Sequence, residues 1–333
     1  MDYRHGYIAS YSVAVVDPRT WLDVGWLKII SGSTSRSETG LRQSADMTVR
    51  RYDKSIDKYV RVYLDTNQNG ARAREPLFTG IATSPGDDHK EGVTDIRIQC
   101  YSVLKDAEDI SLPLGWYAPA GASTAIILRQ LFKGLPEPLI IAAGSPALSE
   151  NIVAEASENV LTMTDKILTA INWRAQITGR GEIMFSPKPT DPAEYFGLNR
   201  NAVVETDFSH GRDFFNCPNV LRVSAGNESY IARDDDPNSP LSTVSRGREV
   251  QRSEDNITLA ESETLQAYGV RRLRELQQMT ETAQYTRLYL PGVNVGDIVE
   301  LNYPELKGRY TVTGQTMQFG APCSVQESVK RVI

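Results

Sequence analysis

The loop that begins at Asp65 carries the arrangement of side chains closest to a known chemical site. Asp65, Asn67 and Asn69 alternate with other residues and are followed by a glycine. This is the first half of a calcium loop, in which side-chain oxygens surround a hard cation. The loop also needs a bidentate glutamate at its twelfth position, which here is Pro76, with Glu75 one place early. The alternative is a hairpin turn, because Asn and Gly tolerate positive φ.

Two short patterns place a serine near a base. Ser55-Ile-Asp-Lys58 fits S-x-x-K, in which a lysine activates a serine, but the companion motifs S-D-N and K-T-G are absent. Ser209 directly precedes His210, whereas nucleophile and base are normally brought together across a fold. With three histidines in the chain, the commonest general base is scarce. The sequence therefore predicts no catalytic residue and no cofactor, and a protein that is not an enzyme.

Clusters of charge are interpreted as solvated structure. The run Asp234 to Asp236 is typical of a polar loop. Further along, arginines and glutamates share one predicted helix, which indicates an exposed helix of mixed charge. These residues are Arg271, Arg272, Arg274, Glu261, Glu263 and Glu275.

The overall charge argues against a protein that grips nucleic acid. The 333 residues include 36 Lys and Arg against 42 Asp and Glu, a net charge of −6, whereas phosphate binding favours a basic excess. The three cysteines, Cys100, Cys217 and Cys323, lie too far apart for a Cys-based zinc site or a disulfide framework. The N-terminus does not resemble a signal peptide, and no run of about 18 apolar residues predicts a membrane span.

The elements that hold these residues are mostly strands in the first third of the chain. Residues 1–112 are expected to form a small antiparallel β-barrel, because short alternating segments are separated by turns. The second strand is predicted to stop where Ser31-Gly-Ser33 begins. Strands are predicted at 11–16, 22–30, 45–50, 59–64, 76–82 and 93–101.

The rest of the chain is expected to form a module and a second barrel. Residues 113–205 predict an α+β module, and residues 206–333 a second β-barrel with one helix at about 260–282. The fold class is thus β-rich α+β, with two small antiparallel β-barrels flanking an inserted α/β module. A hairpin at 219–233 is left unassigned to either barrel. Within the module we predict a helix at 123–132 capped by Ser123 or Thr124, a helix that begins at Thr162 or Thr164 and includes Trp173, and a strand at 182–186.

The order of several stretches resembles the baseplate hub proteins of phage tails and contractile injection systems, including the late-control and type VI spike-hub group. Residues 76–82 and 95–101 look like the family's F-x-G-x-I strand and the strand that follows it. Residues 162–171 and 181–185 are similar to its middle α/β domain. Its closing barrel is matched by residues 263–279, 292–301 and 308–312.

This resemblance implies a structural role. It implies a homotrimer whose three chains present six barrels, as a symmetry adaptor between a sixfold tail tube and a central spike. The implied partners are a tail tube or distal tail protein, a spike protein and the tape measure protein. DNA would pass only in transit, which suits the net charge of −6, and no membrane insertion is implied. The implied location is the virion tail, at its baseplate or tip, after assembly in the bacterial cytoplasm. Because the chain stops at Ile333, we expect the spike to be a separate protein.

Two other hypotheses remain open. One is a cell-wall or glycan hydrolase delivered by a tail, which needs two carboxylates held at a set distance. The 42 acidic residues allow such a pair. The other is a calcium-dependent binding module that uses Asp65, Asn67, Asn69 and Glu75. The sequence does not decide between a contractile and a non-contractile tail, nor does it identify the host or the interface residues.

Overall fold

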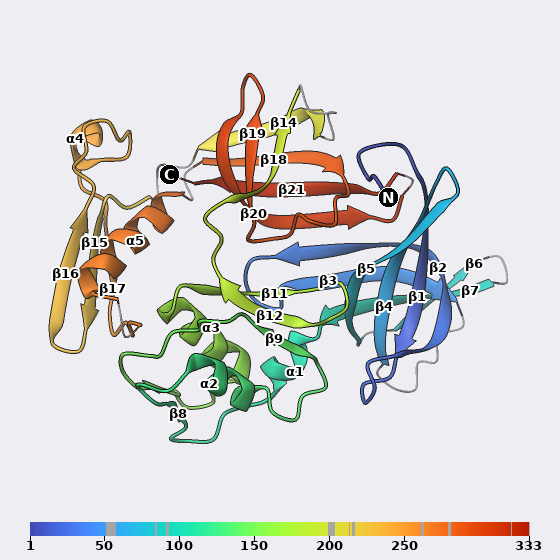
Figure 1. The fold of residues 1–333 in the computed structure, drawn as a ribbon, viewed down its shortest axis with the longest axis horizontal. Helices are drawn as coiled ribbons and strands as arrows, with labels where there is room; N and C mark the ends of the chain where they lie inside the picture. Colours follow the sequence, from blue (N-terminus) through green and yellow to red (C-terminus); the bar gives the residue numbers. More distant parts are fainter. Residues whose placement is uncertain are drawn as a thin grey trace.

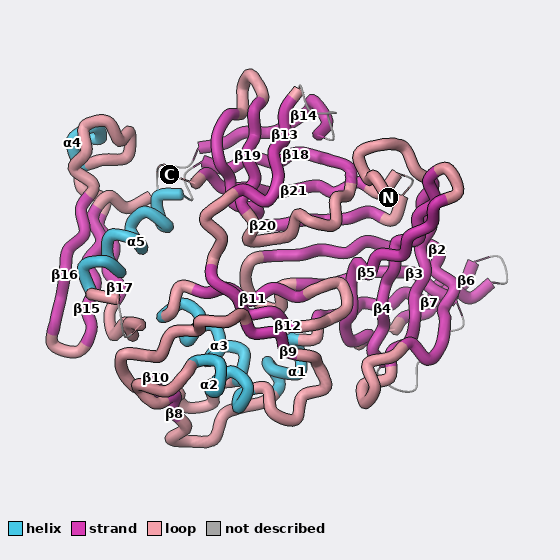
Figure 2. The backbone as a smooth tube through the Cα atoms, viewed as in Figure 1, coloured by secondary structure: helices cyan, strands magenta, loops and turns pink. Residues whose placement is uncertain are grey.

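The fold consists of four parts that meet at the centre of the molecule (Figure 1). We call them the N-terminal β unit (β1–β7), the α/β module (α1–β12), the C-terminal β unit (β13, β14 and β18–β21) and the side layer (β15–β17, α4 and α5). In Figure 2 the helices belong to the module and the side layer. The computed structural model describes residues 1–50, 58–83, 85–90, 93–198, 204–212, 214, 217–260, 263–278, 281–320 and 322–332.

The strands of the N-terminal β unit pair in a circuit. Along the sheet the order is β1, β4, β5, β7, β3 and β2, and β2 pairs again with β1. All these pairings are antiparallel. The strands are β1 (Ile8–Val16), β2 (Asp23–Ser37), β3 (Gln43–Arg50), β4 (Lys58–Gln68), β5 (Ala71–Ala82) and β7 (Val93–Ser102), with β6 (Gly86–Lys90) paired to β7.

Strand β2 joins the two β units into one sheet. Its first half pairs with β1, and its second half, from Ser33 to Ser37, pairs with β20 of the C-terminal unit. The prediction that this strand stops at Ser31 is therefore wrong. A bulge after Ile29 carries the strand onward, and Gly32 leaves space for the second unit. A Cβ at Gly32 would lie 2.8 Å from the ring of Phe319, so only glycine permits this approach.

The C-terminal β unit continues from β20. Pairing runs from β20 through β21 and β18 to β14, and on the other side β20 pairs with β19, which pairs with β13. Strand β13 lies in the range expected for the module, yet it pairs in parallel with β19. The strands are β13 (Pro192–Gly197), β14 (Val204–Arg212), β18 (Glu281–Leu288), β19 (Ile298–Asn302), β20 (Lys307–Gln318) and β21 (Ser324–Arg331).

The α/β module contains the two predicted helices with shifted ends. The second helix is capped by Asn159, whose side chain accepts from the Thr162 amide at 2.8 Å, rather than by Thr162 or Thr164. Trp173 belongs to a strand and not to that helix. The elements are α1 (Leu104–Asp109), β8 (Tyr117–Ala118), α2 (Thr124–Leu131), β9 (Leu139–Ile141), β10 (Ile152–Val153), α3 (Val160–Ala170), β11 (Trp173–Ile177) and β12 (Ile183–Pro187).

The 219–233 hairpin, which the sequence left unassigned, lies in the side layer. This hairpin joins neither large unit and forms its own sheet with β17, covered by α5. Helix α5 is shorter than the helix predicted at about 260–282, because strand β18 already begins at Glu281. The elements are β15 (Val220–Ala225), β16 (Glu228–Arg233), α4 (Thr243–Arg246), β17 (Gln251–Glu254) and α5 (Leu265–Gln278). No helix among the described residues is long and apolar enough to cross a membrane.

A buried ion pair lies inside the C-terminal β unit. Arg287 on β18 and Glu327 on β21 form it, and their side chains are 1% and 0% exposed. Gln315 donates to the same Glu327 carboxylate at 2.7 Å and to the Val293 carbonyl at 2.9 Å. Removing one member of such a pair leaves the other charge buried without compensation.

We therefore expect Glu327→Gln to lower the free energy of unfolding by about 3 kcal/mol or more. The matched control is Glu300→Gln on β19, whose partner Arg309 lies 3.7 Å away at an exposed position, with an expected loss below about 1 kcal/mol. Urea denaturation midpoints measure both losses. Equal losses in the two variants would contradict this account of the buried pair.

Candidate functional site

Polar contacts fix the α/β module against both β units. The Gln43 side chain on β3 donates to the Ile177 carbonyl at 2.6 Å. On the other side, Arg174 on β11 donates to Asp297, before β19, at 2.8 Å. These contacts hold the module across the joint between the two β units. The side layer reaches the same place, because Lys188 pairs with Glu275 on α5 at 3.0 Å.

A cavity of about 710 Å³ lies where the four parts meet, and we call it the central cleft. Its walls come from the β2–β3 connection, α3 and β11, the C-terminal half of α5, and the turn before β19. Seven arginines and two lysines line it, against the carboxylates of Glu38, Asp165 and Glu275. A cavity so rich in cations stands out in a chain whose net charge is −6.

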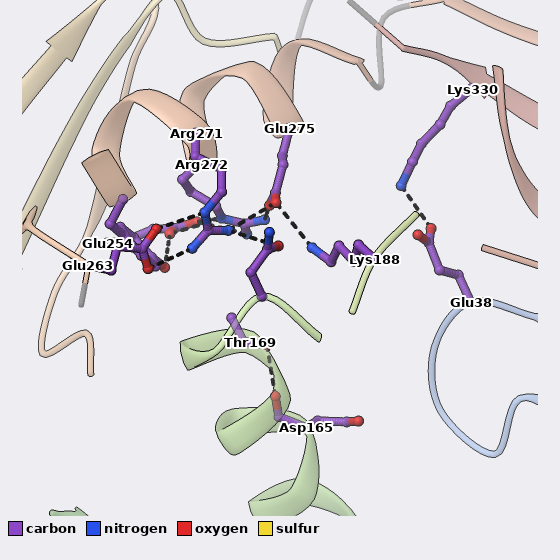
Figure 3. A network of polar contacts seen from close by, with 12 residues as sticks. Glu38, Asp165, Thr169, Lys188, Glu254, Glu263, Arg271, Arg272, Glu275 and Lys330 are labelled. Carbon is purple, nitrogen blue, oxygen red and sulfur yellow. Dashed lines mark hydrogen bonds and ion pairs between the residues drawn. The ribbon is translucent and has the colours of Figure 1, made fainter. Parts of the chain in front are cut away.

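Glu275 gathers three of these cations (Figure 3). Its carboxylate lies 3.0 Å from Lys188, 3.0 Å from Arg271 and 3.1 Å from Arg272. Burial acts to raise the pKa of Glu275, but the neighbouring positive charges hold that pKa below its usual value. The carboxylate therefore stays ionised and anchors α5 at the cleft wall.

Other cations of the cleft pair individually. Arg42 lies 2.5 Å from Asp165, and Lys330 lies 2.8 Å from Glu38. Two more arginines also have glutamate partners outside the cleft lining, since Arg271 pairs with Glu263 and Arg272 with Glu254, both at 2.9 Å. Arg271 and Arg272 thus pair with acidic residues, as the mixed-charge interpretation expects, but both are half-buried rather than exposed, and Glu254 lies outside the helix on β17. Glu261 lies outside the described residues.

Several guanidinium groups in the cleft have unused donors. Arg36 donates to the Asn294 side chain and to a backbone carbonyl, and has no carboxylate partner within the described ranges. Four buried nitrogens also lack an acceptor among these residues: Nε of Arg36, Nε of Arg42, and Nε and Nη1 of Arg174. Arg252 and Arg274 are exposed and make no hydrogen bond or ion pair with the residues that the structure describes. An unsatisfied buried donor is costly, so these groups favour an anionic partner.

The structure places the Asp65 loop in a β-hairpin. Gln68 pairs with Ala71, and the two residues between them, Asn69 and Gly70, have φ of 52° and 88°. This is the turn that Asn-Gly favours in a two-residue hairpin. The Asn67 side chain accepts from the Gly70 amide at 3.1 Å. The hairpin interpretation thus accounts for the polar residues of this loop.

Three of the four candidate calcium ligands, Asp65, Asn67 and Glu75, have other partners. Asp65 accepts from Ser12 and from Arg74, both at 2.5 Å. Glu75 pairs in register with Leu64, so it is offset by one residue from Asp65 and lies on the opposite face of the hairpin; it accepts from Tyr3 at 3.2 Å. No group of three or more potential metal ligands among His, Cys, Asp and Glu occurs within the described ranges.

The remaining sequence candidates lie apart from the cleft. His210 contacts Glu281 at 3.2 Å and not Ser209, which is its neighbour on β14. In the acidic run, Asp234 accepts from Gln277 at 3.0 Å and Asp236 accepts from the Asn238 amide at 2.9 Å, so the run organises its own loop. Ser55 lies outside the described residues. The three cysteines, Cys100, Cys217 and Cys323, are buried, and none of them forms a disulfide in the part of the chain that the structure describes.

One carboxyl pair escapes detection in the sequence because its members come from different elements. Glu137 precedes β9 and is 5% exposed, and its carboxyl group lies beside that of Asp106. Burial and then the adjacent Asp106 raise the pKa of Glu137 to about 9. Tyr59 donates to Asp106. Neither carboxyl group lines the central cleft.

No protein-family model and no curated protein matches the sequence. Similar solved structures do exist. A tail protein from Neisseria meningitidis is 14% identical with a TM-score of 0.70, over 98% of this chain and 97% of that one. The 43 kDa tail protein of prophage MuSo2 from Shewanella oneidensis is 12% identical with a TM-score of 0.68, over 97% and 98%.

A third similar structure belongs to a secretion machine. It is an E. coli component of the type VI secretion system, described as similar to two tail proteins of bacteriophage T4. It is 10% identical with a TM-score of 0.54, over 91% of this chain and 73% of that one. The chain thus has the fold of phage tail and type VI spike-related proteins, consistent with the resemblance to baseplate hubs.

For the Asp65 hairpin we expect isothermal titration calorimetry to detect no saturable heat at millimolar calcium. The physical reason is that calcium would have to displace Arg74 from the Asp65 carboxylate. Saturable heat in the wild type that disappears in Asp65→Asn would establish the calcium module instead.

For the buried Glu137 we compare the free energies of unfolding of Glu137→Gln and the wild type. We expect their difference to shift in favour of the variant as pH rises from about 5 to about 8. Folded Glu137 keeps its proton, whereas in the unfolded chain the carboxyl group has its ordinary pKa of 4.5 and releases the proton above that pH. The free energy of unfolding of the wild type therefore falls by at most about 1.4 kcal/mol per pH unit in this window. The variant does not lose this stability, because glutamine does not titrate. Urea midpoints across the pH range measure this.

The matched control for this titration is Glu150→Gln, at an exposed position of the same module. A difference between wild type and Glu137→Gln that stays constant with pH would show that Glu137 is ionised in the folded protein.

Proposed function

We propose that the chain is the structural hub of a phage-type tail or contractile injection machine. In this role three copies form a symmetry adaptor that joins a sixfold tail tube to a central spike. The location is the virion tail, at its baseplate or tip, after assembly in the bacterial cytoplasm. The neighbours are a tail tube or distal tail protein, the spike and the end of the tape measure protein, and DNA only passes through.

One observation carries the proposal. The likeness to two phage-type tail proteins extends over nearly the whole of both chains. The shared feature is therefore the arrangement of all four parts, and not one widespread domain. Fold by itself does not specify function, so the assembled state is the property to test.

The pairing of the strands supports the adaptor geometry. In the described part of the N-terminal β unit, six strands pair in a circuit, as a closed barrel requires. The C-terminal β unit also has six described strands, in the order β14, β18, β21, β20, β19 and β13. We infer two similar barrels per chain, and three chains would then present six barrels to the tube.

The domain limits form part of the same proposal. We retain a first barrel at 1–112, a module at 113–205 and a second barrel at 206–333 that contains the side layer. Four clusters of buried apolar residues are centred in the two β units, the module and the side layer, although the cluster of the C-terminal unit also includes Tyr3, Leu64 and Leu77 from the N-terminal part of the chain. Strand β13 would be the segment by which the module passes into the second barrel.

A structural role also fits the chemistry of the site residues. The acidic pair Asp106 and Glu137 is largely enclosed, so a glycan would have little access to it. Tyr59 also donates a hydrogen bond to Asp106. The hydrolase hypothesis keeps a direct test, which is zymography on cell-wall material. Lysis by the purified chain would overturn the structural proposal.

We place a contact between copies on the outward face of β2. Leu22, Val24, Trp26 and Ile30 lie along or next to this strand with exposures of 64%, 64%, 54% and 44%. Exposed apolar side chains that adjoin one another on a surface are typical of an interaction site. Trp26 packs against Tyr63 and the Arg74 guanidinium group, so its indole ring already has contacts within the chain.

Multi-angle light scattering tests the assembly. We expect a trimer, or a monomer that becomes trimeric as concentration rises, and Val24→Lys should weaken the trimer at least about tenfold, because it places a charge in an apolar contact. The matched control is Val244→Lys on α4, at a position 59% exposed, which should leave the trimer unchanged. A stable dimer would contradict the proposal.

A further inference from the structure

The central cleft has a charge that its own residues do not balance. Its nine cations face three carboxylates in the lining. Asp297, Glu254 and Glu263 pair with cleft cations from outside the lining and bring the carboxylates to six. An excess of three positive charges remains, in a chain whose net charge is −6.

The arginines that make up this excess come from separate parts of the fold. Arg36 lies on β2, Arg252 on β17 and Arg274 on α5, and none of them pairs with a carboxylate within the described ranges. The described residues thus supply no carboxylate to balance these three charges. An anion that binds among them would provide the missing counter-charge.

Two arginines of the cleft lining also have buried donors without an acceptor among the described residues. Arg42 is 9% exposed, and its Nε is one of these donors. Arg174 leaves two buried nitrogens unused although its third nitrogen binds Asp297. The guanidinium group presents its donors in a rigid fork that matches carboxylate oxygens. The cleft therefore offers charge and hydrogen-bond donors to a ligand with several oxyanion groups.

We propose that the central cleft binds a short acidic peptide segment of a partner protein. The carboxylates of this segment pair with Arg36, Arg252 and Arg274. This ligand lies beyond the hub proposal and does not depend on trimer formation, because one chain supplies every wall of the cleft.

Size and surroundings favour a short peptide over a nucleic acid. The volume of about 710 Å³ lies within the range of pockets for compact ligands. A long polyanion would extend beyond the cleft and meet a protein with a net charge of −6, whereas a short segment meets only the basic walls. The walls also include Leu168, Trp173 and Val295, which suit apolar side chains placed between carboxylates.

Fluorescence anisotropy with a labelled Glu-Leu-Glu-Leu-Glu peptide tests the proposal on the full chain. We expect saturable binding that weakens with salt, and no binding of the matched Gln-Leu-Gln-Leu-Gln peptide. The double variant Arg252→Gln/Arg274→Gln should bind the acidic peptide at least about tenfold more weakly. Both arginines are exposed and have no described hydrogen-bond or ion-pair partner, so the fold should be unaffected.

The control variant is Arg129→Gln, which removes one exposed arginine of α2 outside the cleft and should leave the affinity unchanged. Absence of saturable binding in the wild type would overturn the proposal, as would an equal loss in Arg129→Gln. Tripolyphosphate and a single-stranded oligothymidine serve as competitors. If either binds more tightly than the peptide and depends on the same arginines, the cleft is a phosphate site and the peptide proposal is wrong. Trimer formation in light scattering is read separately and does not enter these outcomes.

Discussion

The strand shared by the two β units is the constraint on which the rest of the structure depends. Strand β2 pairs first within the N-terminal circuit and then with β20, so the two units are parts of one hydrogen-bonded sheet. The backbone of Gly32 accepts from the Phe319 amide at 3.0 Å, at the point where a side chain would collide with the Phe319 ring. Because sheet pairing fixes both register and direction, the relative orientation of the units is set by backbone hydrogen bonds rather than by flexible linkers.

This fixed joint determines where charge gathers. The module spans both units through Gln43 and Arg174, and the side layer approaches through Lys188. Each part brings cations that are well separated along the chain, and their meeting produces a basic cleft within an acidic protein. The net charge of the protein repels a long polyanion, whereas the basic walls of the cleft favour a short anionic segment.

The same geometry keeps the buried acidic pair of the module apart from the central cleft. Perturbed carboxyl groups often mark active sites, but Glu137 lies in the interior of the module and away from the cleft. Among the described residues the cleft is lined mainly by cations and hydrogen-bond donors. The likeness in fold to tail proteins extends over nearly the whole chain and supports the structural role that we propose.

The sequence by itself determined the local elements. Alternation placed most strands of the N-terminal unit, and the Asn69-Gly70 pair determined a hairpin turn, because side-chain period and φ preference are local properties. It could not place the end of β2 or the strand character of Trp173, since pairing with distant strands overrides local signals there. Only the tertiary structure decided that the 219–233 hairpin stands apart, that Asp106 meets Glu137, and that distant arginines share one cleft. Those outcomes depend on contacts between residues far apart in the chain, and no spacing within one segment encodes them.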